Sequence, residues 1–465
     1  MAQLLERDYL INLLKTKRKH DTGKALDVLP FLTKRTGAIR DQFSKVLGEF
    51  VRNICELELN EKSIKKQEFY MSSEENELSE HIANAVEFNE EDDRYDFIRF
   101  LDDYLFNQDE IKPIHPFLFN YIKVEKKHKN EFGKYANFMK DILIQDNKEI
   151  TSIFKEKVSD NILSELILDN IFALDKTGPI NQQYQPLLSS LTKNYQEDIM
   201  FLSRHKDYFL TSFPVITHFY IFMYACQLVF KFDQFTKADY NQAHPFYFGL
   251  EWESMSKRRQ AAEFDGFKLI KEKMENLFPH IHTMSQLSHN CFTEKHDPKP
   301  FMTYSQLYQL ISERGIEFEE LAFIEVKEWI KDYSDWASNV KVNDDSKTLD
   351  EAFKVLFKCL KQGTSKGVAE KFGKNLEDLG ASHFIKSRGS IGQVLNIKHD
   401  FLLLLTAVSV KDRRIPLNEL FNEFEKRGVA FDRYSKKEII NLYDKLNIID
   451  KKSDSGDAQY VKPIL

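Results

Sequence analysis

The sequence predicts a mainly α-helical protein, a multi-helix array followed by a C-terminal module with a small β-hairpin. Only 12 of the 465 residues are proline and 16 are glycine, the two residues that most strongly break helices. Lysine, glutamate and leucine, which favour helices, are frequent. Apolar residues also recur with the 3.6-residue period of an amphipathic helix through most of the chain. We therefore expect helices almost throughout.

Three helical patterns occupy most of the last eighty residues. The first, Asp400–Val408, is apolar all round, which is typical of a helix surrounded by a core. Gly428 follows the second pattern at the place where a left-handed C-cap would end a helix. The third is predicted to begin at Ser435, with Glu438 three residues later as its capping partner. The apolar stripe of the second helix comprises Leu417, Leu420, Phe421 and Phe424. That of the third comprises Ile439, Leu442, Tyr443 and Leu446.

A hairpin is predicted after the third helix. Residues 448–452 and 458–461 have the composition of two strands, and the polar turn between them contains Gly456. Three helices followed by a hairpin are the outline of a winged helix-turn-helix-like module, which we place at residues 386–465. Modules of this kind bind DNA or dock on proteins, and the fold alone does not decide between the two.

Basic and amide side chains of this module are the candidate DNA contacts. They are Arg413, Arg414, Arg433, Lys436, Lys437, Asn441, Lys451 and Lys452. The acidic neighbours Glu438, Asp444 and Asp450 would repel phosphate, so charge alone leaves DNA and protein as alternative ligands. If these side chains contact phosphates, replacing Arg413, Arg414, Lys436 and Lys437 by glutamate should weaken binding to every DNA sequence. The same change should flatten the salt dependence of binding.

The remaining chain divides into four predicted segments. They are an N-terminal helical segment at 1–60, an acidic insertion at 61–112, a central helical domain at 113–340, and a linker with a Gly-rich basic segment at 341–385. The boundary at 113 follows from two prolines, Pro113 and Pro116, because residues before proline avoid the α region. Residues 73–110 carry fourteen acids, whereas both ends of the chain are basic. With a net charge of −7, the whole chain is not a basic nucleic-acid coat.

Three constellations have an enzymatic or metal-binding interpretation beside a structural one. Glu325-Val326-Lys327 resembles the Glu-x-Lys strand of Mg²⁺-dependent nucleases, but helical spacing around it favours an amphipathic helix. Residues 363–367 lack the full Walker spacing, so ATP binding is not expected there. Five further residues, four histidines and a cysteine, have side chains that zinc accepts, but their spacing matches no standard zinc site. The alternative that we expect is that the histidines lie on the surface or cap helices. The five residues are His280, His282, His289, His296 and Cys291. We predict no catalytic residue, metal or cofactor.

The expected location is the cytoplasm. The four cysteines are far apart and form no Cys-x-x-Cys pair, which indicates a reducing compartment. The chain starts without the apolar stretch of a secretory signal. The uncharged run Tyr208–Phe230 is long enough to span a bilayer, but it contains Pro214 and His218, so a buried core helix is favoured over a membrane segment.

Parts of the sequence resemble the DptG family, the G component of the bacterial restriction module that accompanies DNA phosphorothioation. The residues that carry the resemblance are the tail Lys452–Val461, the segment Gly428–Arg433, the Leu-rich helix from Phe401, and the central segment Phe246–Lys257. The overall length is similar as well. The resemblance appears over most of the chain, with its specific motifs concentrated after residue 385.

The resemblance implies a non-catalytic subunit of a cytoplasmic antiviral defence complex. Such a subunit would assemble with DptF-type and DptH-type restriction components and with double-stranded DNA, to restrict DNA that lacks phosphorothioate sulfur. The ATP-dependent and cleaving chemistry of that system is associated with the other components, so no catalytic residue is implied here. Two alternatives stay open at this point: a Mg²⁺-dependent nuclease that uses Glu325 and Lys327, and a protein scaffold without DNA contact. The oligomeric state stays unknown.

Overall fold

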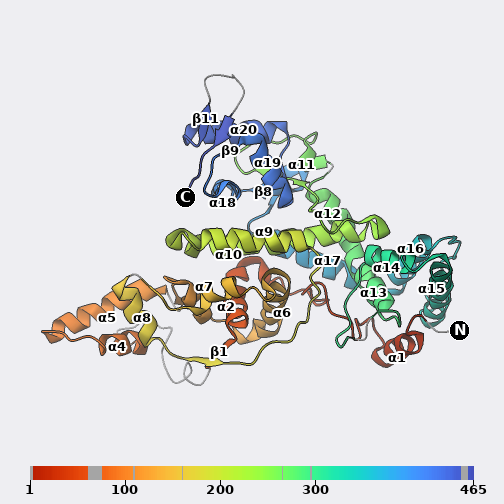
Figure 1. The fold of residues 1–465 in the computed structure, drawn as a ribbon, viewed down its shortest axis with the longest axis horizontal. Coiled ribbons are helices and arrows are strands. Elements are labelled where there is room, and N and C mark those ends of the chain that lie inside the picture. The colour runs from red at the N-terminus through yellow and green to blue at the C-terminus, as the bar shows by residue number, and fades with distance from the viewer. Residues whose placement is uncertain are drawn as a thin grey trace. The chain divides into compact units, whose positions relative to one another are not determined.

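The mainly α-helical fold class predicted from the sequence is confirmed. The computed structural model describes residues 4–60, 76–107, 110–159, 161–263, 265–293, 296–451 and 459–465. Helices dominate these residues, and the strands are short (Figure 1). The chain divides into two compact units: unit 1 comprises residues 1–41, 183–191 and 219–465, and unit 2 comprises residues 42–182 and 192–218. Three of the four divisions fall within helices, α2 (Ile39–Cys55), α9 (Ser189–Leu202) and α10 (Lys206–Phe232), and the fourth falls between residues 182 and 183.

Unit 2 is a set of short helices with two small antiparallel ladders. Its helices are α4 (Glu77–Ala83), α5 (Glu91–Leu105), η1 (Pro116–Tyr121), η2 (Lys126–His128), α6 (Lys129–Met139), the π-helical turn η3 (Lys140–Ile144), α7 (Lys148–Lys155) and α8 (Ile162–Asn170). Strand β1 (Leu57–Leu59) pairs with β4 (Leu174–Lys176), and β2 (Phe106–Asn107) pairs with β3 (Glu110–Ile111). An apolar cluster from α4, α5, η1 and α8 forms a core in this unit.

The predicted acidic insertion is part of this unit. Asn76 caps α4 by accepting hydrogen bonds from the backbone N–H groups of Leu78 and Ser79, at 3.0 and 3.1 Å. Residues 61–75 lie outside the described residues. Pro113 lies between β3 and η1, and Pro116 is the first residue of η1, but the residues on both sides of the two prolines belong to unit 2. The predicted domain boundary at 113 is therefore wrong, because a proline break separates elements without separating cores.

Unit 1 contains most of the remaining helices. They are α1 (Arg7–Lys17), η4 (Phe235–Lys237), α11 (Gln260–Glu263), α12 (Phe267–Lys273), η5 (Met274–Asn276), α13 (Leu277–Ser288), α14 (Tyr304–Ser312), α15 (Ile316–Trp336), α16 (Leu349–Gly363), α17 (Lys366–Gly380), η6 (Gly389–Ile391), α18 (His399–Val410), α19 (Leu417–Lys426) and α20 (Arg433–Lys445). Its strands are β5 (Phe246–Tyr247), β6 (Gly249–Leu250), β7 (Ile385–Ser387), β8 (Gln393–Ile397), β9 (Ile415–Pro416), β10 (Val429–Ala430), β11 (Ile449–Lys451) and β12 (Gln459–Val461).

The predicted linker with a Gly-rich basic segment at 341–385 is mostly helical instead. Helices α16 and α17 occupy residues 349–380, and α16 buries one complete face. Thr348 caps α16 by accepting from the N–H of Glu351 at 3.3 Å. The prediction failed because it was based on the glycine and lysine content of this segment. The apolar residues of α16, which recur at helical spacing and are buried, decide the structure.

The C-terminal residues are joined to the middle of the chain by two parallel strand pairs. β10 pairs with β5, so that Val429 faces Phe246, and β8 pairs with β6, so that Asn396 faces Gly249. Residues 386–465 are therefore not a separate domain, and 113–340 is not a single central domain. The sequence signal for these pairings is weak because each involves only two residues per strand.

Helix α10 is, among the described residues, the helix long and apolar enough by length and composition to cross a membrane. In the structure 83% of its apolar window is buried. This burial agrees with the predicted core helix, which tolerates Pro214 within its length. Cys55, Cys226 and Cys359 are buried thiols, Cys291 is exposed, and none of the four is in a disulfide.

Candidate nucleic-acid interface

In the range 399–461, the described residues, 399–451 and 459–461, form three helices and a three-stranded sheet. Helices α18, α19 and α20 follow one another, and the sheet has the order β11-β12-β9 (Figure 1). The predicted hairpin is present as β11 and β12, with Asp450 facing Tyr460. Strand β9, which places Pro416 opposite Tyr460, was not predicted, because two residues next to a helix carry no strand pattern. Residues 452–458 of the predicted hairpin lie outside the described residues.

The second helix ends as predicted. Gly428 has a φ of +84°, the left-handed conformation expected after a helix C-terminus. A side chain at this position would also meet Met223 Sδ at 2.7 Å. The start of the third helix was predicted wrongly, because Asp432 and not Ser435 is the N-cap. Asp432 accepts hydrogen bonds from the N–H groups of Tyr434 and Ser435, at 2.9 and 3.0 Å.

Helix α20 has one buried face and one exposed polar face. The buried residues are Ser435, Ile439 and Tyr443. The exposed residues follow the same four-residue spacing and are Arg433, Lys437, Asn441 and Lys445. Residues four apart lie on one side of a helix, so three cations and an amide share this surface, and Tyr434 and Asp444 of the same helix are exposed as well. Leu446, which was predicted to be buried, is 44% exposed, and Leu442 is half-buried.

A buried ion network fixes the beginning of α20 to residues 250–259. The Arg259 guanidinium donates to both oxygens of Asp432 and, through Nη2, to Glu253 at 2.9 Å. Ser435 Oγ donates to Glu253 Oε1 at 2.9 Å. Burial alone would raise the pKa of Asp432, but the hydrogen bonds from Arg259 and the backbone outweigh it and lower that pKa. The N-cap carboxylate is thereby held ionised in an almost solvent-free position.

This network places further cations beside α20. A cavity of about 860 Å³ lies between residues 254–260 and the first turn of the helix. It is lined by Ser254, Met255, Ser256, Arg258, Arg259, Gln260, Asp432, Arg433 and Tyr434, and we call it the arginine cavity. Arg258 and Lys257 are exposed, and within the described residues neither side chain forms an ion pair. Tyr434 is 50% exposed between the guanidinium groups of Arg433 and Arg259, which lie 4.6 and 5.0 Å from its ring centroid.

Lys257 and Arg258 were missed as candidate contacts. The sequence signal that could have found them is the run Lys257-Arg258-Arg259, three cations in an otherwise mixed segment. Their position next to α20 depends on the pairing of β5 with β10 and on the buried network at Arg259. Neither is visible in a linear sequence.

The other predicted contacts are placed less favourably for DNA. Arg414 lies 4.0 Å from Asp450 and stacks on Tyr460, so part of its charge is compensated within the sheet. Lys436 is half-buried with its Nζ 4.8 Å from the centroid of the Phe421 ring. Arg413 is exposed. Lys451 ends β11, and Lys452 lies outside the described residues. The structure thus groups Arg433, Lys437 and Asn441 on α20 and ties Arg414 to the sheet.

The Glu-x-Lys strand considered for a nuclease is not present. Glu325 and Lys327 lie within the 21-residue helix α15, as the helical spacing predicted. Lys327 Nζ is 3.5 Å from Asp344 Oδ2, and Glu325 accepts from the N–H of Leu5 at 3.5 Å. Two residues two apart on a helix point to different sides, so these side chains do not form a shared metal site.

The histidines between 280 and 296 were predicted to be surface or capping residues, and three of them are buried instead. His280 stacks on Phe357, with a centroid distance of 3.9 Å, and His282 lies against Phe278. His289 Nε2 accepts from the N–H of Lys24 at 3.1 Å. Burial lowers the pKa of all three rings, so they are neutral core residues. In the described part of the chain no group of three or more His, Cys, Asp or Glu side chains is arranged to hold a metal ion.

Comparison with protein-family models finds no match for this chain, and comparison with curated proteins finds no similar protein either.

Proposed function

We propose that this protein is a DNA-binding, non-catalytic subunit of a bacterial restriction complex, and that α20 and the arginine cavity form its DNA contact. One observation carries the DNA contact. Arg433, Lys437 and Asn441 share the exposed face of α20, and Arg258 lies beside the beginning of that helix across the arginine cavity. In this proposal the module is a winged helix-turn-helix, and α20 is its recognition helix.

The chemistry of these side chains suits a duplex. Arginine and lysine bind phosphate oxygens, while asparagine in the major groove pairs with the adenine edge through two hydrogen bonds. The N-cap carboxylate Asp432 is buried and paired with Arg259, but Glu253 shares the same guanidinium, so the buried network keeps one net negative charge.

The restriction role rests on the resemblance of residues 246–257, 428–433 and 452–461 to the DptG family. Two of these segments are neighbours, since Phe246 pairs with Val429. A cytoplasmic location and assembly with DptF-type and DptH-type components belong to the same proposal. The role needs no catalytic residue in this chain. The DNA contact and the restriction role are separable, and the first can be tested without the partners.

The test is a titration of the purified full chain against labelled duplex DNA at about 50 and 200 mM salt. The informative variant replaces Arg258, Arg433 and Lys437 by glutamate, since these three exposed cations are not compensated by carboxylates among the described residues. We expect weaker binding to all sequences. The slope of log K against log salt should fall by about 0.9 for each phosphate contact that is lost.

A matched control replaces three exposed lysines, Lys331, Lys347 and Lys371, by glutamate, since these residues neither line the arginine cavity nor belong to α20. The control should leave the affinity and the slope unchanged. Equal weakening in both variants would mean that net charge and not this site governs binding. Absence of binding by the chain alone, with tight assembly on the partner components, would favour the protein scaffold.

A further inference from the structure

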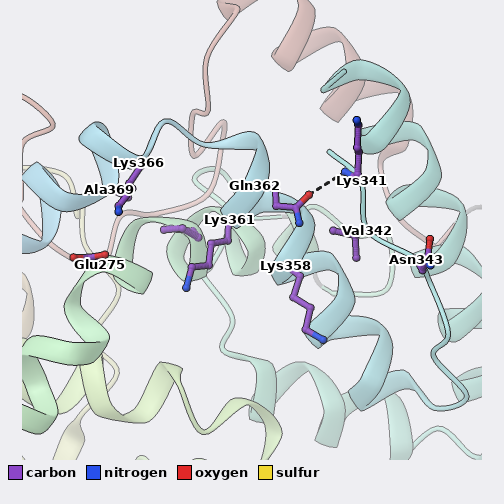
Figure 2. Close-up of a pocket in the computed structure, with 10 residues that line it drawn as sticks. Glu275, Lys341, Val342, Asn343, Lys358, Lys361, Gln362, Lys366 and Ala369 are labelled. Carbon is purple, nitrogen blue, oxygen red and sulfur yellow. Dashed lines mark hydrogen bonds between the residues drawn. The ribbon is translucent and has the colours of Figure 1, made fainter. Parts of the chain in front are cut away.

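A second basic hollow lies in unit 1, away from the residues of the module. It has a volume of about 630 Å³ and is formed by η5, α13, residues 341–343, α16 and α17. Its lining residues are Glu275, Pro279, Lys341, Val342, Asn343, Lys358, Lys361, Gln362, Lys366 and Ala369 (Figure 2). We call it the lysine cavity.

The walls of the lysine cavity are held together by close helix packing. Gly373 lets α17 approach η5 so closely that a Cβ atom there would lie 2.5 Å from the Met274 carbonyl oxygen. At the end of α16, a Cβ on Gly363 would lie 2.2 Å from the hydroxyl of Tyr333. The segment at 341–343 is fixed as well, because the N–H of Lys341 donates to Gln362 Oε1 at 2.9 Å (Figure 2). The shape of the lysine cavity is therefore fixed by the packing of the surrounding helices.

The charge of the lysine cavity is strongly positive and largely uncompensated. Four lysines and one carboxylate, Glu275, line it, and one of the lysines, Lys366, is paired with Glu370 outside the lining at 3.7 Å. Within the described residues, the side chains of Lys341, Lys358 and Lys361 form no ion pair or hydrogen bond, and all three are exposed. By contrast, Lys354, one turn earlier on α16, forms an ion pair with Asp350 at 2.5 Å.

The position of the lysines indicates an anionic ligand. Lys358 and Lys361 are three residues apart on α16, a spacing at which like charges repel, and Lys366 is the first residue of the neighbouring helix α17 (Figure 2). The first turn of α17 adds backbone N–H groups that the Ser365 side chain does not cap. Cations from two helices that line one concave volume match a ligand with several negative charges.

We propose that the lysine cavity binds a small polyphosphorylated molecule of the nucleoside-triphosphate class. Its volume lies in the range of about 300–1,000 Å³ that is usual for small-molecule sites. Val342, Pro279 and Ala369 provide an apolar wall beside the charges, which suits a base or a ribose next to a phosphate chain. A DNA duplex presents its phosphates on a convex rod, so it does not fill a hollow of this size.

Calorimetric titration of the full chain tests this proposal, with ATP and inorganic triphosphate as separate ligands. Lys358→Gln with Lys361→Gln is the test variant, and Lys347→Gln with Lys371→Gln is the control of equal charge change. We expect wild-type binding that the test variant weakens by at least about tenfold and the control leaves unchanged, since one hydrogen bond to a charged group contributes about that much. Tighter binding of ATP than of triphosphate would indicate that the nucleoside is recognised, and equal binding would indicate recognition of the phosphate chain alone.

Two results would overturn the proposal. One is the absence of any binding of either ligand at about millimolar concentration, well above the affinities of usual sites. The other is a test variant that keeps wild-type affinity for both ligands, whatever its affinity for DNA. If that variant also loses affinity for duplex DNA, these lysines belong to the nucleic-acid interface instead. Neither result depends on the DNA contact proposed for α20.

Discussion

The arginine cavity and the lysine cavity are both basic, yet their charges are arranged in opposite ways. At the arginine cavity, Arg259 is buried and its guanidinium is fully used by Asp432, Glu253 and neighbouring oxygens. At the lysine cavity, Lys358 and Lys361 are exposed and have no carboxylate partner among the described residues. A buried charge needs its partners inside the protein, whereas exposed cations on a concave surface can take theirs from a ligand. The first arrangement positions a helix, and the second is suited to binding.

The largest effect that tests this contrast is expected from Arg259→Met. Removing the guanidinium leaves Asp432 and Glu253 buried without a cation, which should lower the free energy of unfolding by about 3–5 kcal/mol. Urea denaturation of the wild-type protein and of the Arg259→Met variant measures this difference in the free energy of unfolding. Arg258→Met, at the exposed neighbour, should change stability by less than about 0.5 kcal/mol. Similar small effects at both positions would remove the distinction between a buried anchor and an exposed contact.

Gly373→Ala should act on the wall of the lysine cavity. The new methyl group would lie 2.5 Å from a backbone oxygen, so we expect a loss of about 1–3 kcal/mol in thermal or urea unfolding. Gly367→Ala in the same helix is the control, because a Cβ atom there would come no closer than 4.0 Å to a neighbouring atom, the Ser365 hydroxyl oxygen. There, alanine should be neutral or stabilising by up to about 1 kcal/mol. A neutral Gly373→Ala would show that α17 does not need this close approach.

The pH dependence of stability should reflect the buried histidine next to the lysine cavity. Burial lowers the pKa of His280 well below its ordinary value of 6.5, and Lys361 and Lys273 lower it further. The unfolded chain therefore takes up the proton first, so the contribution is complete above pH 6.5 and is lost as pH falls below it, by up to about 1.4 kcal/mol per pH unit. His280→Phe should flatten that part of the profile. An unchanged slope below pH 6.5 would contradict a neutral, buried His280.

His20 should contribute in the same direction over a defined window. Burial lowers its pKa to about 4, so stability from this group should fall between pH 6.5 and about 4 and stay constant below. Denaturation of His20→Gln measured across this window gives its share. A profile identical to that of the wild-type protein would show that His20 is not buried in solution.

The smallest effect has the opposite sign. Lys358→Gln with Lys361→Gln removes like charges at neighbouring helical positions, so without ligand it should stabilise the protein by about 0.2–0.5 kcal/mol. Thermal unfolding at low salt measures this gain, which screening should reduce at high salt. A loss of stability would mean that these lysines have partners in the folded chain, and the contrast with the arginine cavity would disappear.

The elements that were predicted from the sequence are those with a clear local pattern of residues. Helix α18 is buried nearly all round as its apolar composition indicated, and Gly428 adopts the left-handed conformation expected of a C-cap. Helical spacing also placed Glu325 and Lys327 correctly on a helix. Such features depend on residues that are close in sequence, so period and capping rules reach them.

Features that depend on distant pairs were missed. Ser435 looked like an N-cap, but the buried network with Glu253 and Arg259 draws it into the helix and leaves that role to Asp432. Helices α16 and α17 were hidden by their lysine and glycine content. The arginine cavity needs residues 254–260 and 432–434 together, and only the fold provides this proximity.

The contact between α20 and DNA can be measured most directly by photo-cross-linking. A photoreactive residue replacing Asn441, on the exposed face of α20, should cross-link to a bound duplex. The same residue at Lys371 on α17 is the control and should give no cross-link above background. Cross-linking at position 441 alone is the result that we predict. If the chain binds the duplex but cross-links at position 371 and not at 441, α20 is not the helix that contacts DNA.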